Sequence, residues 1–388
     1  MNFELEYTAE HEEFRQHVRE WIKANVPNIE CPAEMEELDN RMHSLAWDLR
    51  RRLAAKGWLH PSLPKEYGGA GLSLQEQEIL QEELSLCPMP AVYDRSNILN
   101  AALLRVGTEE QKKKFLTLSA RGQIVVWQCF TEPDAGTDLA SLCCQAVPTG
   151  NGFVLNGCKT YTGDCRQVDY LYTLAVTDAK APRHANISAF LVKADSRGIS
   201  RTPLRPIAGA QKNTIYFENV IVPKENLIGE INKGWAVANI SLAAERAAWG
   251  NVLRLNSLFD EFLEYCKHTK RNGRPLASNP RVADLLVNLF LEIRTRDLLS
   301  ARNAWRRRTG IPNTYEAAQA ALHTKRLLPL FASTLLEIAG PYALVRDKWA
   351  ILRGRVEHFQ RRSLMTHGGG TPEAQRMVIA KALNLGRG

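Results

Sequence analysis

Residues 131–138 read TEPDAGTD and mark the point where the chain changes character. Before this stretch, apolar residues recur with helical spacing over residues 10–22 and 45–53. After it come short runs rich in β-branched and aromatic residues, separated by Gly-Asn-Gly and Asn-Gly turn signals. From Trp235 onward long helical patterns return. The order therefore predicts helices, then a β-domain, then helices again.

We expect an α+β fold that is mainly α. Its predicted parts are an N-terminal helical domain at residues 1–124, a middle antiparallel β-domain at 125–228 and a C-terminal four-helix-type bundle at 229–388. Strands are predicted at residues 153–155, 170–176, 187–192 and 214–222, and C-terminal helices at 236–248, 255–267, 282–307 and 315–338. In the first domain, Ser73 and Glu76 have the spacing of a capping box for a helix from Leu74 to Leu84.

Composition narrows the class of protein. At 388 residues the chain has room for two or three packed subdomains, and its formal net charge of +8 suits an anionic ligand. The basic residues are diffuse and no reading motif accompanies them, which argues against a nucleic-acid binder. Eight cysteines without paired metal spacing predict reduced thiols, no metal site and a cytoplasmic location. No apolar run approaches the roughly 20 residues of a membrane span, so none is expected.

Four segments, in this order, resemble signatures of the acyl-CoA dehydrogenase family: PKEYGGAGLS at 64–73, TEPDAGTD at 131–138, NGCKTYTG at 156–163 and GGGTPEAQR at 368–376. The resemblance covers essentially the whole chain. It implies the three-part fold, FAD as cofactor, an acyl-CoA substrate and an electron-transferring flavoprotein as electron acceptor. FAD and CoA both carry phosphates, which agrees with the positive charge.

The second and third segments would meet the flavin. By resemblance, Gln128, Phe130, Thr131 and Thr137 are candidate contacts to its pyrimidine edge, and Thr137 also to the substrate. A Gly/Pro loop lets backbone amides approach a ring closely.

In NGCKTYTG, Tyr161 stands where the family has Trp. Gly163 replaces the usual Thr or Ser that bonds flavin N5. We expect that bond to come from the backbone or from Thr162.

The last segment lacks the expected base. Thr371 and Glu373 match positions near the FAD adenosine, but the glutamate of many members falls at Gly369, which has no acid. Members of the isovaleryl- and long-chain types carry the base on the helix after the β-domain, just before an arginine. Here that position is Glu245, followed by Arg246, and Glu245 is the only acid between Glu230 and Asp260.

The resemblance therefore assigns Glu245 as the base that removes the α-proton while the β-hydrogen leaves as hydride to flavin N5. It leaves the backbone N–H of Gly369 as a donor to the thioester oxygen, and places Arg246 near the substrate.

Two weaker matches concern the far end of FAD. Glu337 and Gly340 belong to EIAGPY, which resembles the family's QxxGG turn. The segment KRNGRPL resembles RxxFGxPL, which reaches across the family's dimer, but Thr269 and Asn272 stand at its Arg and Phe positions. Arg271 is the alternative cation.

These departures leave assembly and activity open. The chain is expected to form a homo-oligomer, dimeric or tetrameric, or a heteromer with a related subunit. The alternatives to a dehydrogenase are a flavin-poor or catalytically weak structural partner subunit and an acyl-CoA oxidase-like flavoenzyme.

Overall fold

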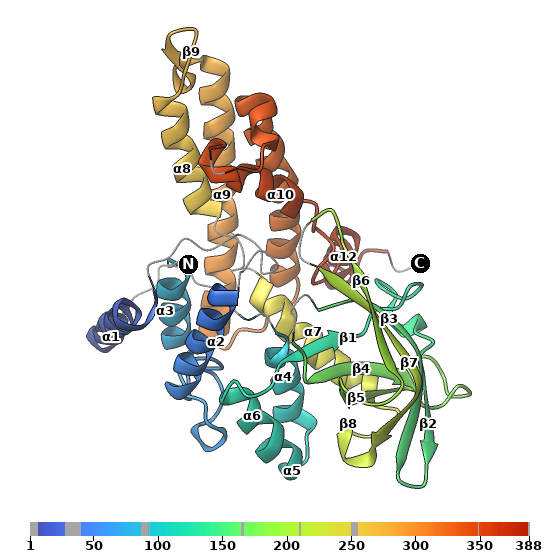
Figure 1. The fold of residues 1–388 in the computed structure, drawn as a ribbon. Helices are drawn as coiled ribbons and strands as arrows, with labels where there is room; N and C mark the ends of the chain where they lie inside the picture. The colour runs from blue at the N-terminus through green and yellow to red at the C-terminus, as the bar shows by residue number, and fades with distance from the viewer. Residues whose placement is uncertain are drawn as a thin grey trace. The chain divides into compact units, whose positions relative to one another are not determined.

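The computed structural model describes residues 7–27, 40–86, 92, 94–163, 167–208, 211–249, 255–347 and 349–386. Two compact units can be recognised in it. The N-terminal unit comprises residues 7–206 and 210–245, and the C-terminal unit is built mainly on residues 246–388. Figure 1 shows the order of helices, sheet and helices along the chain.

The N-terminal unit begins with helices. They are α1 (Ala9–Asn25), α2 (Asn40–Ala55), α3 (Leu74–Ser85), α4 (Ser96–Val106), α5 (Glu109–Gln111) and α6 (Thr117–Ala120), with a π-helical turn, η3, at Lys112–Leu116. The predicted capping box is confirmed at the start of α3. The Ser73 side chain accepts from the backbone N–H of Glu76 at 3.2 Å, and the Glu76 carboxylate accepts from the N–H of Ser73 at 2.7 Å.

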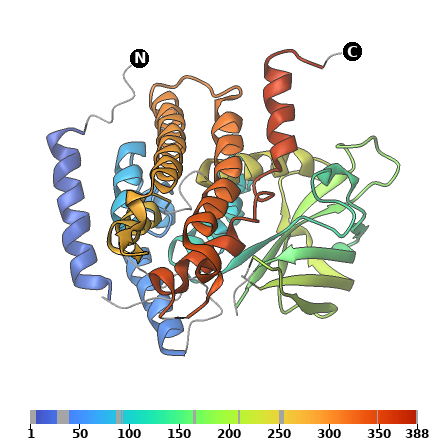
Figure 2. The ribbon, with the colours of Figure 1, turned by 90° about the horizontal axis from the view of Figure 1, so that it is seen from above.

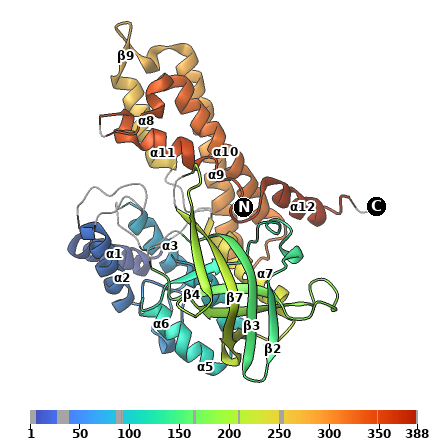
Figure 3. The same ribbon diagram turned by 45° about the vertical axis from the view of Figure 1, so that its right-hand side comes forward.

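An eight-stranded sheet follows, with order β6-β7-β3-β2-β4-β5-β8 and with β1 beside β4. Its strands are β1 (Val126–Cys129), β2 (Gln145–Thr149), β3 (Gly152–Thr162), β4 (Tyr170–Val176), β5 (Ile187–Lys193), β6 (Ile199–Leu204), β7 (Lys212–Pro223) and β8 (Leu227–Ile228). Most pairings are antiparallel, as predicted (Figure 3). However, β1 and β2 run parallel to β4, because long connections rather than hairpins join them to it.

Strand β4 separates two cores. Its alternate side chains point to opposite faces, so Tyr172 and Leu174 pack on the helical side while Leu171 and Ala175 pack inside the β-layer. The helical-side core also contains residues of α4 and η3 and the start of α7 (Gly234–Trp249). The N-terminal helices, the sheet and α7 thus share one core within this unit.

The C-terminal unit is helical apart from a small hairpin. Its elements are α8 (Leu255–His268), β9 (Lys270–Arg271), β10 (Arg274–Pro275), α9 (Pro280–Arg308), α10 (Glu316–Ala339), α11 (Arg355–Arg362) and α12 (Pro372–Ala382). Helix α10 packs against α9, α11 and α12, and the long helices α9 and α10 run side by side (Figure 2).

Residues 316–344, which include α10, are long and apolar enough by length and composition to cross a bilayer. Half of the apolar window in this segment is buried inside the protein, as in the core helix of a globular domain.

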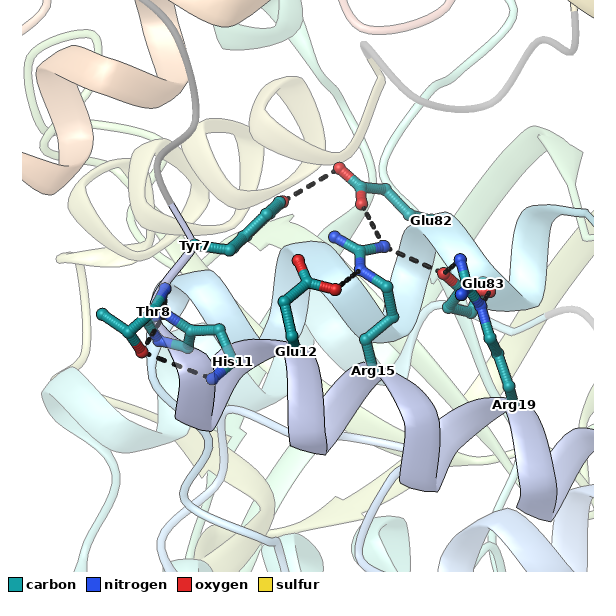
Figure 4. Close-up of polar contacts among 8 residues, drawn as sticks. All are labelled: Tyr7, Thr8, His11, Glu12, Arg15, Arg19, Glu82 and Glu83. Carbon is teal, nitrogen blue, oxygen red and sulfur yellow. Dashed lines mark hydrogen bonds and ion pairs between the residues drawn. The ribbon is translucent and has the colours of Figure 1, made fainter.

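A cluster of charges fastens α1 to α3 (Figure 4). Glu83 on α3 is 4% exposed and accepts hydrogen bonds from Arg15 at 2.9 Å and from Arg19 at 2.9 and 3.0 Å. Its neighbour Glu82 accepts from Arg15 at 2.8 Å and from the Tyr7 hydroxyl at 3.1 Å. Burial raises the pKa of Glu83, but the bonds from Arg19 and Arg15 outweigh it, so the pKa lies below its ordinary value.

We expect Glu83→Gln to loosen α1. Losing charged hydrogen bonds at a buried carboxylate costs about 2 kcal/mol, which corresponds to roughly 30-fold faster exchange of α1 amides, measurable by hydrogen–deuterium exchange. In the wild type the protection should persist at neutral pH and fall as the pH drops through the lowered pKa, because protonation removes the acceptor charge. Glu82→Gln is the control and should change exchange much less, since Glu82 lies on the surface. Equal effects of the two variants would contradict the assignment.

Candidate functional site

Helix α7 is fixed to the sheet one turn before Glu245. The Ser241 hydroxyl lies 2.9 Å from the Tyr172 hydroxyl of β4 and donates to the backbone oxygen of Ile98 at 3.2 Å. All three residues are buried. Since residues four apart share one face of a helix, Glu245 follows Ser241 toward the sheet.

Glu245 is itself buried, at 9% exposure, and faces the end of β1. Its Oε2 lies 3.5 Å from Nε2 of Gln128, at the long limit of a hydrogen bond. Gln128 is paired in register with Tyr172, the residue that anchors α7. The structure therefore brings the predicted base to the strand that leads directly into TEPDAGTD.

A buried ion pair joins TEPDAGTD to NGCKTYTG. Lys159 is fully buried and its Nζ donates to Glu132 at 2.7 Å and to the backbone oxygen of Phe130 at 3.1 Å. Glu132 also accepts from the backbone N–H groups of Cys143 at 2.6 Å and Cys144 at 2.9 Å. Together these contacts hold the TEPDAGTD loop in one conformation. This ion pair was not predicted from the sequence. The signal that could have indicated it is a charged residue inside a strand, at a position whose neighbours predict burial.

The TEPDAGTD and NGCKTYTG motifs lie side by side. The backbone N–H of Thr160 donates to the oxygen of Thr131 at 2.9 Å. Tyr161 presents its ring to solvent, with 63% exposure and a positive φ of 55°. Thr131 and Gln128 are half-buried and Thr137 is exposed. These four side chains are open to a ligand.

Two other predicted contacts point into the core. The ring of Phe130 is 3% exposed and packs edge-on against Tyr172 at 5.1 Å. Thr162 is 1% exposed, and its hydroxyl lies 3.4 Å from Sγ of Cys129. Any contact of Phe130 or Thr162 with a ligand would therefore come from the backbone.

Trp127 occupies the space that a side chain at position 163 would need. A Cβ at residue 163 would lie 2.0 Å from Cδ2 and 2.1 Å from Cε3 of Trp127, whose indole is 1% exposed. The backbone of Gly163 also has a φ of +49°, which favours glycine. The packing of β1 against β3 therefore excludes a hydroxyl-bearing side chain at position 163.

In the C-terminal unit, the fourth motif opens α12. The Thr371 hydroxyl caps this helix by accepting from the N–H of Ala374 at 3.2 Å. Glu373, in the first turn, is exposed, and backbone hydrogen bonds there lower its pKa. Gly369 and Gly370 have φ values of +66° and +95°, a left-handed backbone that favours glycine.

The two weaker motifs meet each other. Arg271, on the β9–β10 hairpin, donates to the backbone oxygen of Ile338 at 3.2 Å, at the end of α10. Gly340 follows with a φ of +69°, and a Cβ there would have open space around it. Glu337 is bound by Arg281 at 2.6 Å on the surface.

The hairpin turns at Asn272 and Gly273, both with positive φ, as an Asn-Gly turn requires. Asn272 is therefore a turn residue here, at the position where the family carries Phe.

Arg246 belongs to α7, but its side chain is outside the described residues. No group of three His, Cys, Asp or Glu in the described part of the chain is arranged to hold a metal ion.

We expect Gly163→Ala to destabilise the N-terminal unit by about 2 kcal/mol, because the added methyl would overlap the buried indole of Trp127. Thermal unfolding would measure the loss. Gly136→Ala is the matched control in the neighbouring motif, since its Cβ would meet only the Thr131 methyl, at 3.8 Å. A stable Gly163→Ala protein would show that Trp127 does not define this space.

Comparisons with known proteins identify the family of the chain. Family models of the N-terminal, middle and C-terminal domains of acyl-CoA dehydrogenases match residues 8–123, 128–220 and 232–384. The chain is 30% identical to acyl-CoA dehydrogenase FadE26 of Mycobacterium tuberculosis, over 99% of both proteins. It is also 30% identical to the short-chain-specific acyl-CoA dehydrogenase of Clostridium acetobutylicum, over 98% of the chain and 99% of that protein.

Solved structures give the same result. The Tcur3481–Tcur3483 steroid ACAD matches with a TM-score of 0.87 at 30% identity, over 100% of both chains. The ChsE4–ChsE5 complex from Mycobacterium tuberculosis matches with a TM-score of 0.86 at 30% identity, over 99% of this chain and 100% of that one. With all three domains matched in order, the chain belongs to the acyl-CoA dehydrogenase family of FAD-dependent oxidoreductases.

Proposed function

We propose that this chain removes the α-proton of an acyl-CoA thioester with the carboxylate of Glu245, as the first half of α,β-dehydrogenation to the trans-2-enoyl-CoA. The observation that carries the proposal is the contact between Glu245 and Gln128, which puts a buried carboxylate beside the TEPDAGTD segment. Gly369, where many relatives have their base, has no side chain. Glu245 is therefore the acid that the local geometry supports.

The residues fit FAD within each unit. In the N-terminal unit an exposed Tyr161 ring offers a stacking surface, with the hydroxyls of Thr131 and Thr137 and the Gln128 amide as hydrogen-bonding groups near its motif. We assign these four to the isoalloxazine, with backbone groups of Phe130, Thr162 and Gly163. FAD, when bound, supplies the acceptor for the hydride of the β-carbon.

In the C-terminal unit, Arg271 offers a cation beside the open glycine turn at Gly340, which suits a phosphate. Thr371 and Glu373 are proposed for the adenosine. The loop before α12 is bound at position 325 of α10, and Gly340 lies fifteen residues further along the chain. This stretch of α10 spans roughly 22 Å at about 1.5 Å per residue. Arg271 and Thr371 of one chain are thus far apart along α10, and we propose that each serves a different FAD of an oligomer.

The protein's own part of the reaction is proton removal and charge stabilisation. Glu245 accepts the α-proton, and the Gln128 amide orients its carboxylate. The thioester oxygen gains negative charge as the proton leaves, so a donor must stand ready for it. We assign that role to the backbone N–H of Gly369, and a substrate contact to Arg246. An electron-transferring flavoprotein as acceptor and a cytoplasmic location stay predictions.

We expect Glu245→Gln to retain FAD and to lose turnover by about 10²–10⁴-fold, the usual contribution of a general base. Anaerobic bleaching of the flavin by a panel of acyl-CoAs would measure the rate. Glu230→Gln is the control, because Glu230 is an exposed acid shortly before α7. A rate near that of the wild type would show that Glu245 is not the base. Peroxide release in air would reveal an oxidase instead.

Gln128→Leu tests the contact itself. Because Gln128 is also assigned to the flavin, the variants are compared at full FAD occupancy. If Gln128 acts on proton removal through Glu245, the leucine variant should slow this step in the wild-type background and slow it no further in the Glu245→Gln background. Additive losses would mean that Gln128 acts on another group.

A second candidate is the same dehydrogenase as one half of a heteromer. Asn272, a turn residue here, stands at the Phe position of the family motif, and Thr269 stands at its Arg position. The segment that resembles the one reaching across the family's dimer is therefore altered in this chain. Two of the matched structures are described as pairs of different proteins, Tcur3481–Tcur3483 and ChsE4–ChsE5. We propose that a related subunit supplies the arginine of this motif, whose position is occupied by Thr269 in this chain.

Expression alone and together with a related family member distinguishes the two assemblies. The heteromer should appear as a mixed complex by native mass spectrometry, with more FAD per chain than this protein binds alone. Full flavin content in a homo-oligomer of this chain would contradict the heteromer. A complex that contains flavin but never bleaches would favour the structural-partner role.

A further inference from the structure

Lys325 is a buried cation that binds the loop carrying Gly369. It lies on α10 and is 2% exposed. Its Nζ donates to the backbone oxygen of Thr366 at 2.9 Å and to that of Gly368 at 2.5 Å. Both partners belong to the segment just before α12, which packs against α10.

The bond to Gly368 fixes the direction of the next N–H. In a trans peptide the C=O of one residue and the N–H of the following residue point in opposite directions. The oxygen of Gly368 points at Lys325, so the N–H of Gly369 points away from it. Lys325 therefore sets where this N–H is aimed.

A second side chain holds the following peptides. Nε2 of Gln375, on α12, lies 3.0 Å from the oxygen of Gly369 and 3.4 Å from that of Gly370. Three successive glycines would otherwise sample many conformations, because glycine adopts positive and negative φ with similar ease. Side chains from two helices thus order a run of three glycines, which have no side chains of their own.

We propose that Lys325 is a positioning residue for the oxyanion donor, which aims the N–H of Gly369 and strengthens it as a donor. A cation on the carbonyl oxygen draws electron density through the peptide, so the N–H at its other end becomes more positive. The acceptor is the oxygen of a thioester carbonyl as it gains enolate character. This inference rests on the function proposed above.

The burial of Lys325 supports a role beyond packing. A buried ammonium loses its hydration at a cost of several kcal/mol, and an apolar side chain of similar length could fill the same space between α10 and the loop without that cost. A neutral side chain could tether the loop, whereas a cation also polarises the peptide to which it binds.

Infrared difference spectroscopy separates the two roles. An acyl-CoA labelled with ¹³C at the thioester carbonyl would be bound to the FAD-loaded Glu245→Gln protein, in which it is held and oxidised only slowly. Hydrogen bonds to the carbonyl lower its stretching frequency. Adding Lys325→Met should abolish most of that lowering, and Lys325→Gln, which keeps a neutral donor, should abolish part of it. Lys381→Met, an exposed lysine on α12, is the control and should leave the frequency unchanged.

With Glu245 intact, Lys325→Met should reduce kcat at least about tenfold with little change in KM, since the interaction strengthens as charge develops; this is below the roughly 10²–10³-fold cost of removing an oxyanion donor outright. A bound thioester whose frequency is the same with Lys, Gln or Met at position 325 would overturn the proposal and leave Lys325 as a tether. If the Glu245→Gln protein bound no thioester at all, the proposed function itself would fail, and this inference with it.

Discussion

The buried pair of Lys159 and Glu132 is the interaction on which the site depends. Neither residue reaches the proposed substrate, yet together they tie β3 to the TEPDAGTD loop and occupy the backbone groups of Phe130, Cys143 and Cys144. Because both charges are out of water, loss of either partner would leave the other uncompensated, which typically costs 3–5 kcal/mol. The exposed Tyr161 owes its position to this pair, since it lies two residues after Lys159.

A second set of buried contacts positions Glu245, the proposed base. Tyr172 packs against Phe130, lies beside Gln128 in the sheet, and meets Ser241 of α7. One side chain of β4 thereby connects the TEPDAGTD loop to the helix that carries Glu245. Burial raises the pKa of Tyr172, so it stays a neutral hydroxyl in this network over the whole physiological range.

Much of the fold could be predicted from local patterns. The long helices have strong 3.6-residue periods, and Ser73 with Glu76 identifies the start of α3. Strands β1, β2, β6 and β8 and the hairpin of β9 and β10 were not predicted, because they are short, or exposed and interrupted by proline. The parallel partner of β1 also lies more than 40 residues away. The motifs located the candidate site, but contacts such as Lys325 with Gly368 join residues too distant in sequence for any spacing rule.

Trp127 and Gly163 have a consequence for how this protein can change over time. A serine or threonine at position 163 is not accommodated while Trp127 is present, because the indole occupies the space of its side chain. A smaller residue at position 127 would leave a cavity in the core to which the indole belongs. A hydroxyl-bearing residue at position 163 therefore requires a change at position 127 as well, and each of the two substitutions is expected to be harmful alone.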